Sequence, residues 1–154
     1  MLLVKDHSVT SNGNRQEKQQ RITYCMTIFS KIIAGEIPSY KIAEDEKFFS
    51  FLDINPLVEG HTLVIPKLEI DNFFDIPEDY MSEIFLFARP IAKAIERSFN
   101  CNRCGISVIG LEVPHAHIHL VPINKADDLN FTRKKLNLSR EQLKAAQQKI
   151  LNNL

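Results

Sequence analysis

The stretch Gly110-Leu-Glu-Val-Pro-His-Ala-His-Ile-His-Leu-Val-Pro122 contains three of the five histidines of the chain. They are His115, His117 and His119, with small or aliphatic residues between and after them. Alternation of polar and apolar residues predicts a β-strand, because successive side chains of a strand point to opposite faces. We therefore expect the three imidazoles on one face of a strand, with Cβ atoms roughly 6.5–7 Å apart. A fold seldom needs such a row for packing, so the stretch indicates a functional site.

The overall composition is that of an ordinary globular protein with one domain. The chain has 154 residues, of which 44% are hydrophobic and 25% are charged. Lys plus Arg equals Asp plus Glu, at 19 each, so there is no bulk positive charge to favour nucleic acid, although a local nucleotide pocket is compatible with this balance. The sequence has no apolar run of membrane-spanning length.

The cysteines favour a reducing compartment. There are three, an odd number, and we see no secretory signal, so we expect free thiols in a cytoplasmic protein. Cys101 and Cys104 have the CxxC spacing of zinc and redox motifs, but no second CxxC accompanies them. We interpret this spacing as coincidental.

The chain divides into a polar extension and a folded domain. Residues 1–25 are rich in Ser, Asn, Gln and basic residues, which predicts a flexible extension, and the domain is expected over 26–154. Residues 27–35 have apolar residues at helical spacing, with Thr27 as N-cap and Gly35 as terminator.

The rest of the chain predicts an α+β domain with one antiparallel sheet. Strands are expected over 40–43 and 48–53, with a turn between them, then over 61–67 and 105–109, and the histidine strand is the fifth. Between these lie a short helix over 71–74 and a long helix over 77–99 that Pro90 should kink or break. A capping box at Ser139 begins a last helix. The basic residues 133–135 are interpreted as part of a solvated loop.

Three alternating histidines are compatible with more than one chemistry. Two imidazoles in an HxH pattern can reach one metal ion, but such sites need ligands from further strands, and His61 is the main candidate. A neutral imidazole can also attack phosphorus, if its other nitrogen is fixed and flanking groups donate hydrogen bonds. The third interpretation is a polar sheet face. We favour phosphoryl or nucleotidyl transfer, because three adjacent imidazoles supply a nucleophile with donors on either side.

The run His115-Ala-His-Ile-His-Leu-Val121 matches the His-φ-His-φ-His-φ-φ signature, with φ apolar, and resembles the histidine triad superfamily. Three segments of the amino-terminal half are similar to that family's nucleotide-binding segments, in the same order and spacing. They are residues 28–38 (IFSKIIAGEIP), 51–54 (FLDI) and 60–67 (GHTLVIPK). The resemblance covers residues 27–123.

The resemblance implies a HIT-like fold, in which a long helix and a carboxy-terminal helix pack on a five-stranded antiparallel sheet. It also implies a homodimer that joins two such sheets. The activity it implies is hydrolysis of purine nucleoside phosphoramidates or related conjugates to a nucleoside monophosphate, without metal or cofactor. Dinucleoside polyphosphates are the rival substrates in the family. The sequence is also compatible with a nucleotide-binding regulatory module that has little turnover, and with a zinc-binding protein.

The family pattern assigns roles residue by residue. His117 is the nucleophile that becomes nucleotidylated, His119 contacts the phosphate or leaving group, and His115 supports the network. His61 is the family's additional histidine, and Asp53 accepts hydrogen bonds from the ribose. The other nucleotide-binding positions are Ile28, Phe29, Ile32, Ile37, Phe51, Ile54, Glu112 and Val113.

Two departures from the family pattern lie beside the triad. Leu111 replaces a glutamine that many members have, and residues 104–109 lack the family's phosphate-contacting asparagine. His119 argues against the transferase branch, which usually has glutamine at that position. The leucine at position 111 and the missing asparagine each remove a polar contact to phosphate.

Overall fold

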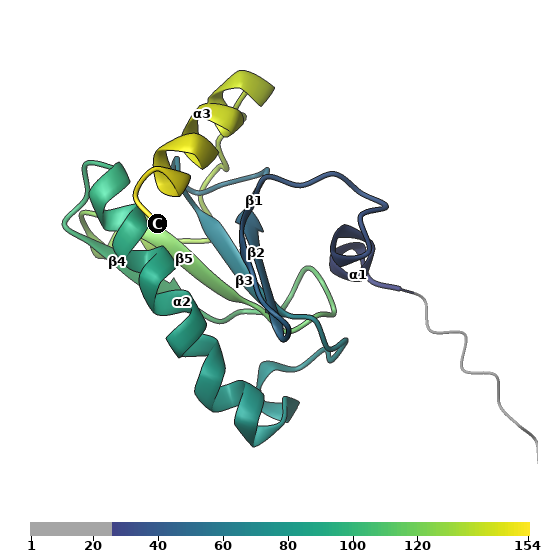
Figure 1. Ribbon diagram of the computed structural model, residues 1–154. Helices are drawn as coiled ribbons and strands as arrows, with labels where there is room; N and C mark the ends of the chain where they lie inside the picture. Colours follow the sequence, from purple (N-terminus) through teal and green to yellow (C-terminus); the bar gives the residue numbers. More distant parts are fainter. Residues whose placement is uncertain (1–25) are drawn as a thin grey trace, which may run out of the picture.

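A five-stranded antiparallel sheet forms the centre of the molecule, as the sequence predicts (Figure 1). The computed structural model describes residues 26–154, so the expected flexible extension over residues 1–25 lies outside the described residues. The strand order is β1-β2-β3-β5-β4. The strands are β1 Lys41–Glu44, β2 Phe48–Leu52, β3 Thr62–Pro66, β4 Arg103–Ser107 and β5 Ile118–Ile123.

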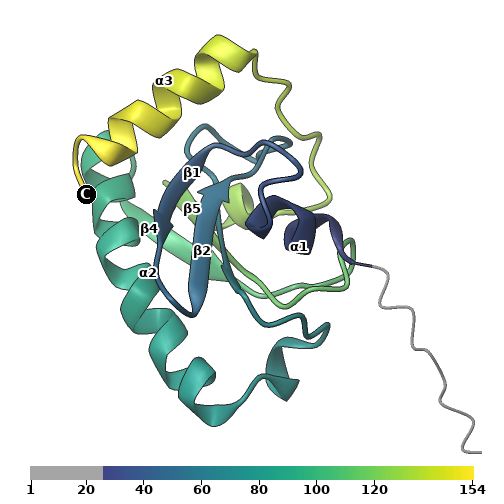
Figure 2. The same ribbon diagram turned by 45° about the vertical axis from the view of Figure 1, so that its right-hand side comes forward.

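Helices cover both faces of this sheet (Figure 2). The long helix α2 (Glu78–Ser98) and the last helix α3 (Arg140–Leu151) lie on one face, and the short helix α1 (Ile28–Ile33) lies on the other. Two 3₁₀ turns, η1 (Phe73–Asp75) and η2 (Ala126–Leu129), lie in the connections. No helix within residues 26–154 combines the length and the apolar character needed to cross a membrane.

Strand β2 shows why both faces need a cover. All five of its residues are buried. Phe48 and Leu52 pack in the core beneath α2 and α3, whereas Phe49 and Phe51 pack with Phe29 of α1. A strand that is buried on both faces is apolar at nearly every position instead of alternating strictly, and in β2 the one polar residue is Ser50. The α1 side is therefore a second, smaller core, and it forms one wall of the site described below.

Helix α2 runs through Pro90, so of the kink or break predicted at this residue the break is wrong. Pro90 is exposed, and Leu86, whose carbonyl loses its usual partner at this proline, is 66% exposed. Water can solvate a carbonyl on that side of the helix. The buried side is held by fully buried Ile91 and Ile95, and this packing outweighs the local cost of the proline.

The histidine strand begins later than predicted. β5 starts at Ile118, so only His119 of the triad lies in a regular strand, and the expectation of three imidazoles on one strand face is wrong. Gly110 has a φ of 67°, which favours glycine, and it lies in the loop of residues 108–117 that joins β4 to β5. The predicted antiparallel pairing of β5 with its predecessor β4 is confirmed, and β5 pairs with β3 on its other side.

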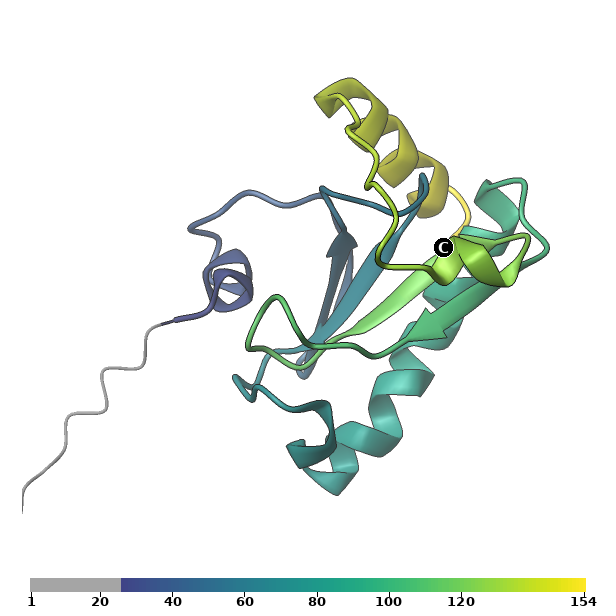
Figure 3. The ribbon, with the colours of Figure 1, turned by 180° about the vertical axis from the view of Figure 1, so that it is seen from behind.

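Both predicted helix caps are present. The side chain of Thr27 accepts a hydrogen bond from the Ser30 amide at the start of α1. At the start of α3, Ser139 and Gln142 form the reciprocal capping box. Figure 3 shows the segment between η2 and α3 from behind, where it passes the end of the sheet before the chain turns into α3.

Candidate active site

A cavity of about 400 Å³ lies between α1, the end of β2, the loop before β5 and the segment before α3. Eleven of the thirteen residues that the sequence proposed for the site line it; the other two, His61 and His115, are buried behind it. Those that line it are Ile28, Phe29, Ile32, Ile37, Phe51, Asp53, Ile54, Glu112, Val113, His117 and His119.

The amino-terminal side of the cavity is apolar. Ile28 and Ile54 are 49% and 59% exposed, so they are cavity walls rather than core residues. Phe29 and Phe51 are buried and meet edge to face, with ring centroids 5.4 Å apart. Phe29 and His117 also meet edge to face, with ring centroids 5.3 Å apart. This side is suited to a flat apolar group such as a nucleobase.

His115 is a supporting residue that does not line the cavity. It is fully buried, and its Nε2 lies 2.8 Å from the carbonyl oxygen of Pro66. Since a carbonyl only accepts, Nε2 must carry the proton, and Nδ1 accepts from the Thr27 hydroxyl at 3.0 Å. Ser30 of α1 donates in turn to the carboxylate of Glu69. These hydrogen bonds connect α1 and the loop after β3 to the loop before β5, which carries His115.

His117 has its reactive nitrogen set by the backbone. Its Nδ1 lies 2.6 Å from the carbonyl oxygen of His115. Nδ1 is therefore the protonated nitrogen, and Nε2 keeps its lone pair. Among residues 26–154, only Nδ1 of this ring has a hydrogen-bond partner, which leaves Nε2 free on a side chain that lines the cavity.

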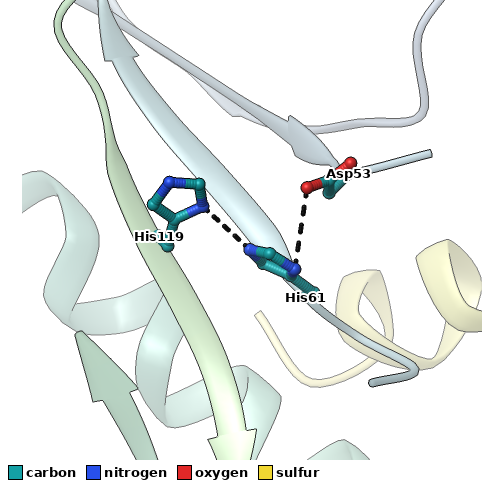
Figure 4. Close-up of side chains that lie close together, drawn as sticks. All are labelled: Asp53, His61 and His119. Atoms are coloured by element: carbon teal, nitrogen blue, oxygen red, sulfur yellow. Dashed lines mark hydrogen bonds and ion pairs between the residues drawn. The ribbon is translucent and has the colours of Figure 1, made fainter. Parts of the chain in front are cut away.

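His61 and His119 form a hydrogen-bonded pair of the opposite kind (Figure 4). The Leu57 amide donates to Nδ1 of His61 at 3.1 Å, so the proton of His61 is on Nε2. Nε2 donates to Nδ1 of His119 at 2.9 Å. The proton of His119 is then on its Nε2. Two neighbouring imidazoles, His117 and His119, thus present an acceptor and a donor to the same cavity, with ring centroids 4.8 Å apart.

Within residues 26–154, one group of side chains could hold a metal ion: Asp53, His61 and His119. Each offers one possible ligand atom, and these atoms lie within 4.8 Å of one another. The ring of His61 separates the other two: its Nε2 faces His119, and its Nδ1 faces the Leu57 amide and Asp53, whose Oδ2 is 3.6 Å away (Figure 4). One ion binds only one nitrogen of a ring. The arrangement fits a hydrogen-bonded relay, in which both nitrogens of His61 already have partners.

Burial lowers the pKa of all four histidines below the usual 6.5. For His119 the charges of His61 and His117 act in the same direction, and for His61 Asp53 opposes the shift only in part. The four imidazoles are therefore neutral at pH 7. This state leaves the lone pair of His117 available at neutral pH.

These pKa shifts predict an acid-sensitive fold. Below pH 6.5 the imidazoles of the unfolded chain bind protons, whereas the buried imidazoles of the folded state stay neutral because their pKa values are lower. The stability is fully present above pH 6.5 and is lost as the pH falls toward the lowered pKa values, by about 1.4 kcal/mol per histidine for each unit of lowering. Urea unfolding at pH 7.5 and pH 5.0 measures the loss. The carboxylates with lowered pKa titrate below their usual 3.8–4.5, outside this window. Equal free energies of unfolding at the two pH values would contradict the assignment.

The segment before α3 contributes residues that the sequence did not predict. Phe131, Thr132 and Lys135 line the cavity. The Phe131 ring packs on His119, with centroids 4.7 Å apart, and Nζ of Lys135 lies 3.6 Å from Glu112 Oε1. The interpretation of 133–135 as a solvated loop is therefore wrong for Lys135. The only sequence signal was an aromatic residue and a lysine within an otherwise polar stretch.

The CxxC spacing has no role that the structure supports. Cys101 and Cys104 are free thiols, and neither lines the cavity. Burial raises the pKa of Cys104 to about 12, so this residue is a thiol and not a thiolate at neutral pH. Metal binding and disulfide exchange both need the thiolate.

Comparison with known proteins agrees with this geometry. The family model for the HIT domain matches residues 34–126. The chain belongs to the HIT family. An uncharacterized HIT-like protein of Borreliella burgdorferi is 38% identical over 135 residues, which cover 82% of this chain and 97% of that protein. The adenosine 5′-monophosphoramidase HNT1 of Saccharomyces cerevisiae is 40% identical over 96 residues, which cover 62% of this chain and 61% of HNT1.

Solved structures of the HIT family share the fold. A zinc-bound histidine triad family protein from Mycobacterium smegmatis has a TM-score of 0.66 and 30% identity, over 81% of this chain and 93% of that one. The zinc belongs to that protein. In this chain both nitrogens of His61 and Nδ1 of His119 take part in hydrogen bonds.

Proposed function

We propose that this HIT protein hydrolyses purine nucleoside 5′-phosphoramidates, or related nucleotide conjugates, and releases a nucleoside monophosphate. The observation that supports this most strongly is the hydrogen bond from Nδ1 of His117 to the His115 carbonyl. It makes Nε2 of His117 a nucleophile, beside a second imidazole that donates from its own Nε2. The name of the yeast relative, an adenosine 5′-monophosphoramidase, is consistent with this substrate class.

In this proposal separate parts of the cavity bind the base and the ribose of the nucleotide. The base lies against the apolar wall that includes Ile28 and Ile54, and the ribose hydroxyls donate to Asp53 at the end of β2. One oxygen of Asp53 accepts from the Asn55 amide at 2.8 Å, and this bond holds the carboxylate at the cavity. The α-phosphate then lies at His117 and His119. Hydrogen bonds to the ribose favour nucleotides over other phosphate compounds.

The chemistry takes two steps. The anionic phosphate raises the pKa of the His61–His119 pair, which takes up one proton with the substrate. Nε2 of His117 then forms a bond to the α-phosphorus while the P–N bond to the leaving group breaks. The leaving nitrogen keeps the electron pair and takes the Nε2 proton of His119, which is replaced on Nδ1 by the Nε2 proton of His61. The products of this step are a free amine and nucleotidylated His117.

The second step runs the proton transfer in reverse. Water attacks the phosphorus and gives a proton to Nε2 of His119, and the bond to His117 breaks with its electron pair returning to Nε2. Asp53 faces the end of this relay, 3.6 Å from Nδ1 of His61, where the charge of the protonated pair is stabilised. No step requires a metal, so we propose a metal-independent reaction.

The test is direct. The protein is incubated with a fluorogenic adenosine 5′-phosphoramidate after dialysis against a chelator, and release of the amine and the monophosphate is followed. We expect turnover that chelation does not reduce. Tight nucleotide binding without release would favour the regulatory module instead, as the loss of a phosphate contact at Leu111 allows. Faster cleavage of dinucleoside polyphosphates would assign the rival substrate, and loss of activity with the metal would overturn the metal-independent mechanism.

We also propose that the active form is a homodimer. Strand β4 is one edge of the sheet, and Ile106 on it is 46% exposed. Pairing of this edge with a second copy would continue the sheet across two subunits and cover it. The molar mass in solution, measured by light scattering, tests this, and a monomer at micromolar concentration would contradict it.

A further inference from the structure

Lys135 has a position that the proposed reaction does not yet use. Among the cavity-lining residues in the described part of the chain, it is the only lysine or arginine. Its side chain is 26% exposed, and Nζ lies 5.8 Å from the centroid of the Phe131 ring. By contrast, the neighbouring Lys134 is exposed and does not line the cavity.

Lys135 borders the cavity near His119, the side on which the proposed reaction places the leaving group. Its neighbour Phe131 packs on His119, the residue whose Nε2 carries the proton for the leaving atom. In an in-line displacement the leaving group departs on the side of the phosphorus opposite to His117. Asp53 lies at the ribose, so the two charged side chains Lys135 and Glu112 are the ones that a leaving group would meet.

Glu112 holds Lys135 only weakly. The two side chains are 3.6 Å apart, but that of Glu112 is 81% exposed. An ion pair so open to solvent is worth about 0–1 kcal/mol. An incoming anion that reaches Nζ can therefore replace Glu112 at little cost.

We propose that Lys135 makes the site selective for leaving groups that carry an anionic group beside the scissile bond, such as an amino acid joined through its α-nitrogen. The carboxylate of the amino acid takes the place of Glu112 on Nζ. This proposal rests on the proposed function and specifies its substrate class. It also gives the segment before α3 a role in binding the substrate. In this chain the polar contacts of the family's glutamine (here Leu111) and asparagine are missing.

Two substrates separate the effect of a charge on the leaving group from the effect of the bond that is broken. They are adenosine 5′-phosphoramidates of glycine and of glycinamide, which share the scissile P–N bond and differ in a carboxylate against a neutral amide. The measured quantity is the ratio of kcat/KM for the two, in wild type and in Lys135→Gln. Comparing this ratio between proteins cancels the different basicities of the two amines.

We expect Lys135→Gln to lower the glycine-to-glycinamide ratio about 3- to 10-fold, as the loss of one partly exposed ion pair predicts. Lys135→Glu should lower it further. Glu112→Gln should raise the ratio, because it frees the ammonium group for the substrate. The matched control, Lys134→Gln, removes the same charge one residue away and should leave the ratio at the wild-type value.

The outcomes are distinguishable. If wild type releases no monophosphate from either substrate, the proposed function itself is wrong. If both are hydrolysed but Lys135→Gln keeps the wild-type ratio, or lowers it no more than Lys134→Gln does, the selectivity is not due to Lys135. A fall in the ratio for Glu112→Gln would overturn the exchange of Glu112 for the substrate carboxylate.

Discussion

Replacing His117 by alanine is expected to lower kcat for phosphoramidate hydrolysis by about three orders of magnitude or more, because the nucleophile is lost entirely. The fold should persist. The His117 side chain is near the cavity surface at 6% exposure, and its one hydrogen bond is to a loop carbonyl. Steady-state kinetics measures the loss, and binding of the nucleoside monophosphate by calorimetry shows whether the cavity is intact.

A glycine at the same position gives a sharper control. His117→Gly leaves a space of imidazole size, and added imidazole should restore part of the turnover by attacking the phosphorus in place of the side chain. Alanine and glycine variants that retain more than a few per cent of the wild-type rate would show that the group attacking phosphorus is not His117.

The second large effect is expected for His119→Gln. The glutamine amide can neither give a proton to the leaving nitrogen in the first step nor take a proton from water in the second step. Loss of such acid–base assistance costs about 10²–10⁴ in rate. With a p-nitrophenyl ester of adenosine 5′-monophosphate, whose leaving phenolate needs no proton, we expect a burst of nitrophenolate equal to the enzyme concentration and then very slow turnover, because nucleotidylated His117 accumulates.

Mass spectrometry of the intact variant measures this. The mass should rise by one nucleotidyl group after mixing with substrate, and peptide mapping should place the group on His117. A control variant, His119→Gln with His117→Ala, should gain no mass. Slow turnover of this ester by His119→Gln without a burst or adduct would mean that the second step does not limit the variant, and it would contradict the role of His119 as the base for water.

The sequence predicted the sheet and most of the site because both rest on local patterns. The apolar runs of β2 and β3 and the capping residues Thr27 and Ser139 determine their elements with little help from the rest of the chain. Family motifs then identified Asp53 and the histidines. Where a pattern and a motif coincided, as at the end of β2, the residue lies where it was expected.

The misses have tertiary causes. Alternation at 115–119 predicted one strand, but the Ala116 amide donates to the Ile70 carbonyl at 2.6 Å, and His115 is buried against Thr27 and Pro66 instead of facing the cavity. The three imidazoles therefore have three different environments. Their unequal roles follow from carbonyl and amide groups that a side-chain pattern does not reveal.

Lys135 was missed for a related reason. A charged residue in a polar stretch normally lies in solvent. Here the chain leads from η2 past the end of the sheet before α3 begins, and this path places Phe131 on His119 and Lys135 across from Glu112. Lys134 and Lys135 are equivalent as sequence patterns, and only the course of the backbone places Lys135 in the cavity and Lys134 in solvent.

The central claim is that the reaction passes through nucleotidylated His117, and the stereochemistry at phosphorus tests it most directly. A nucleoside phosphoramidate made chiral at the α-phosphorus by one sulfur atom is hydrolysed by the wild-type protein in ¹⁸O-labelled water, and the configuration of the product is determined. Two in-line displacements, first by His117 and then by water, invert the phosphorus twice, so we expect overall retention. Overall inversion would show that water attacks the substrate directly, and it would contradict the covalent intermediate.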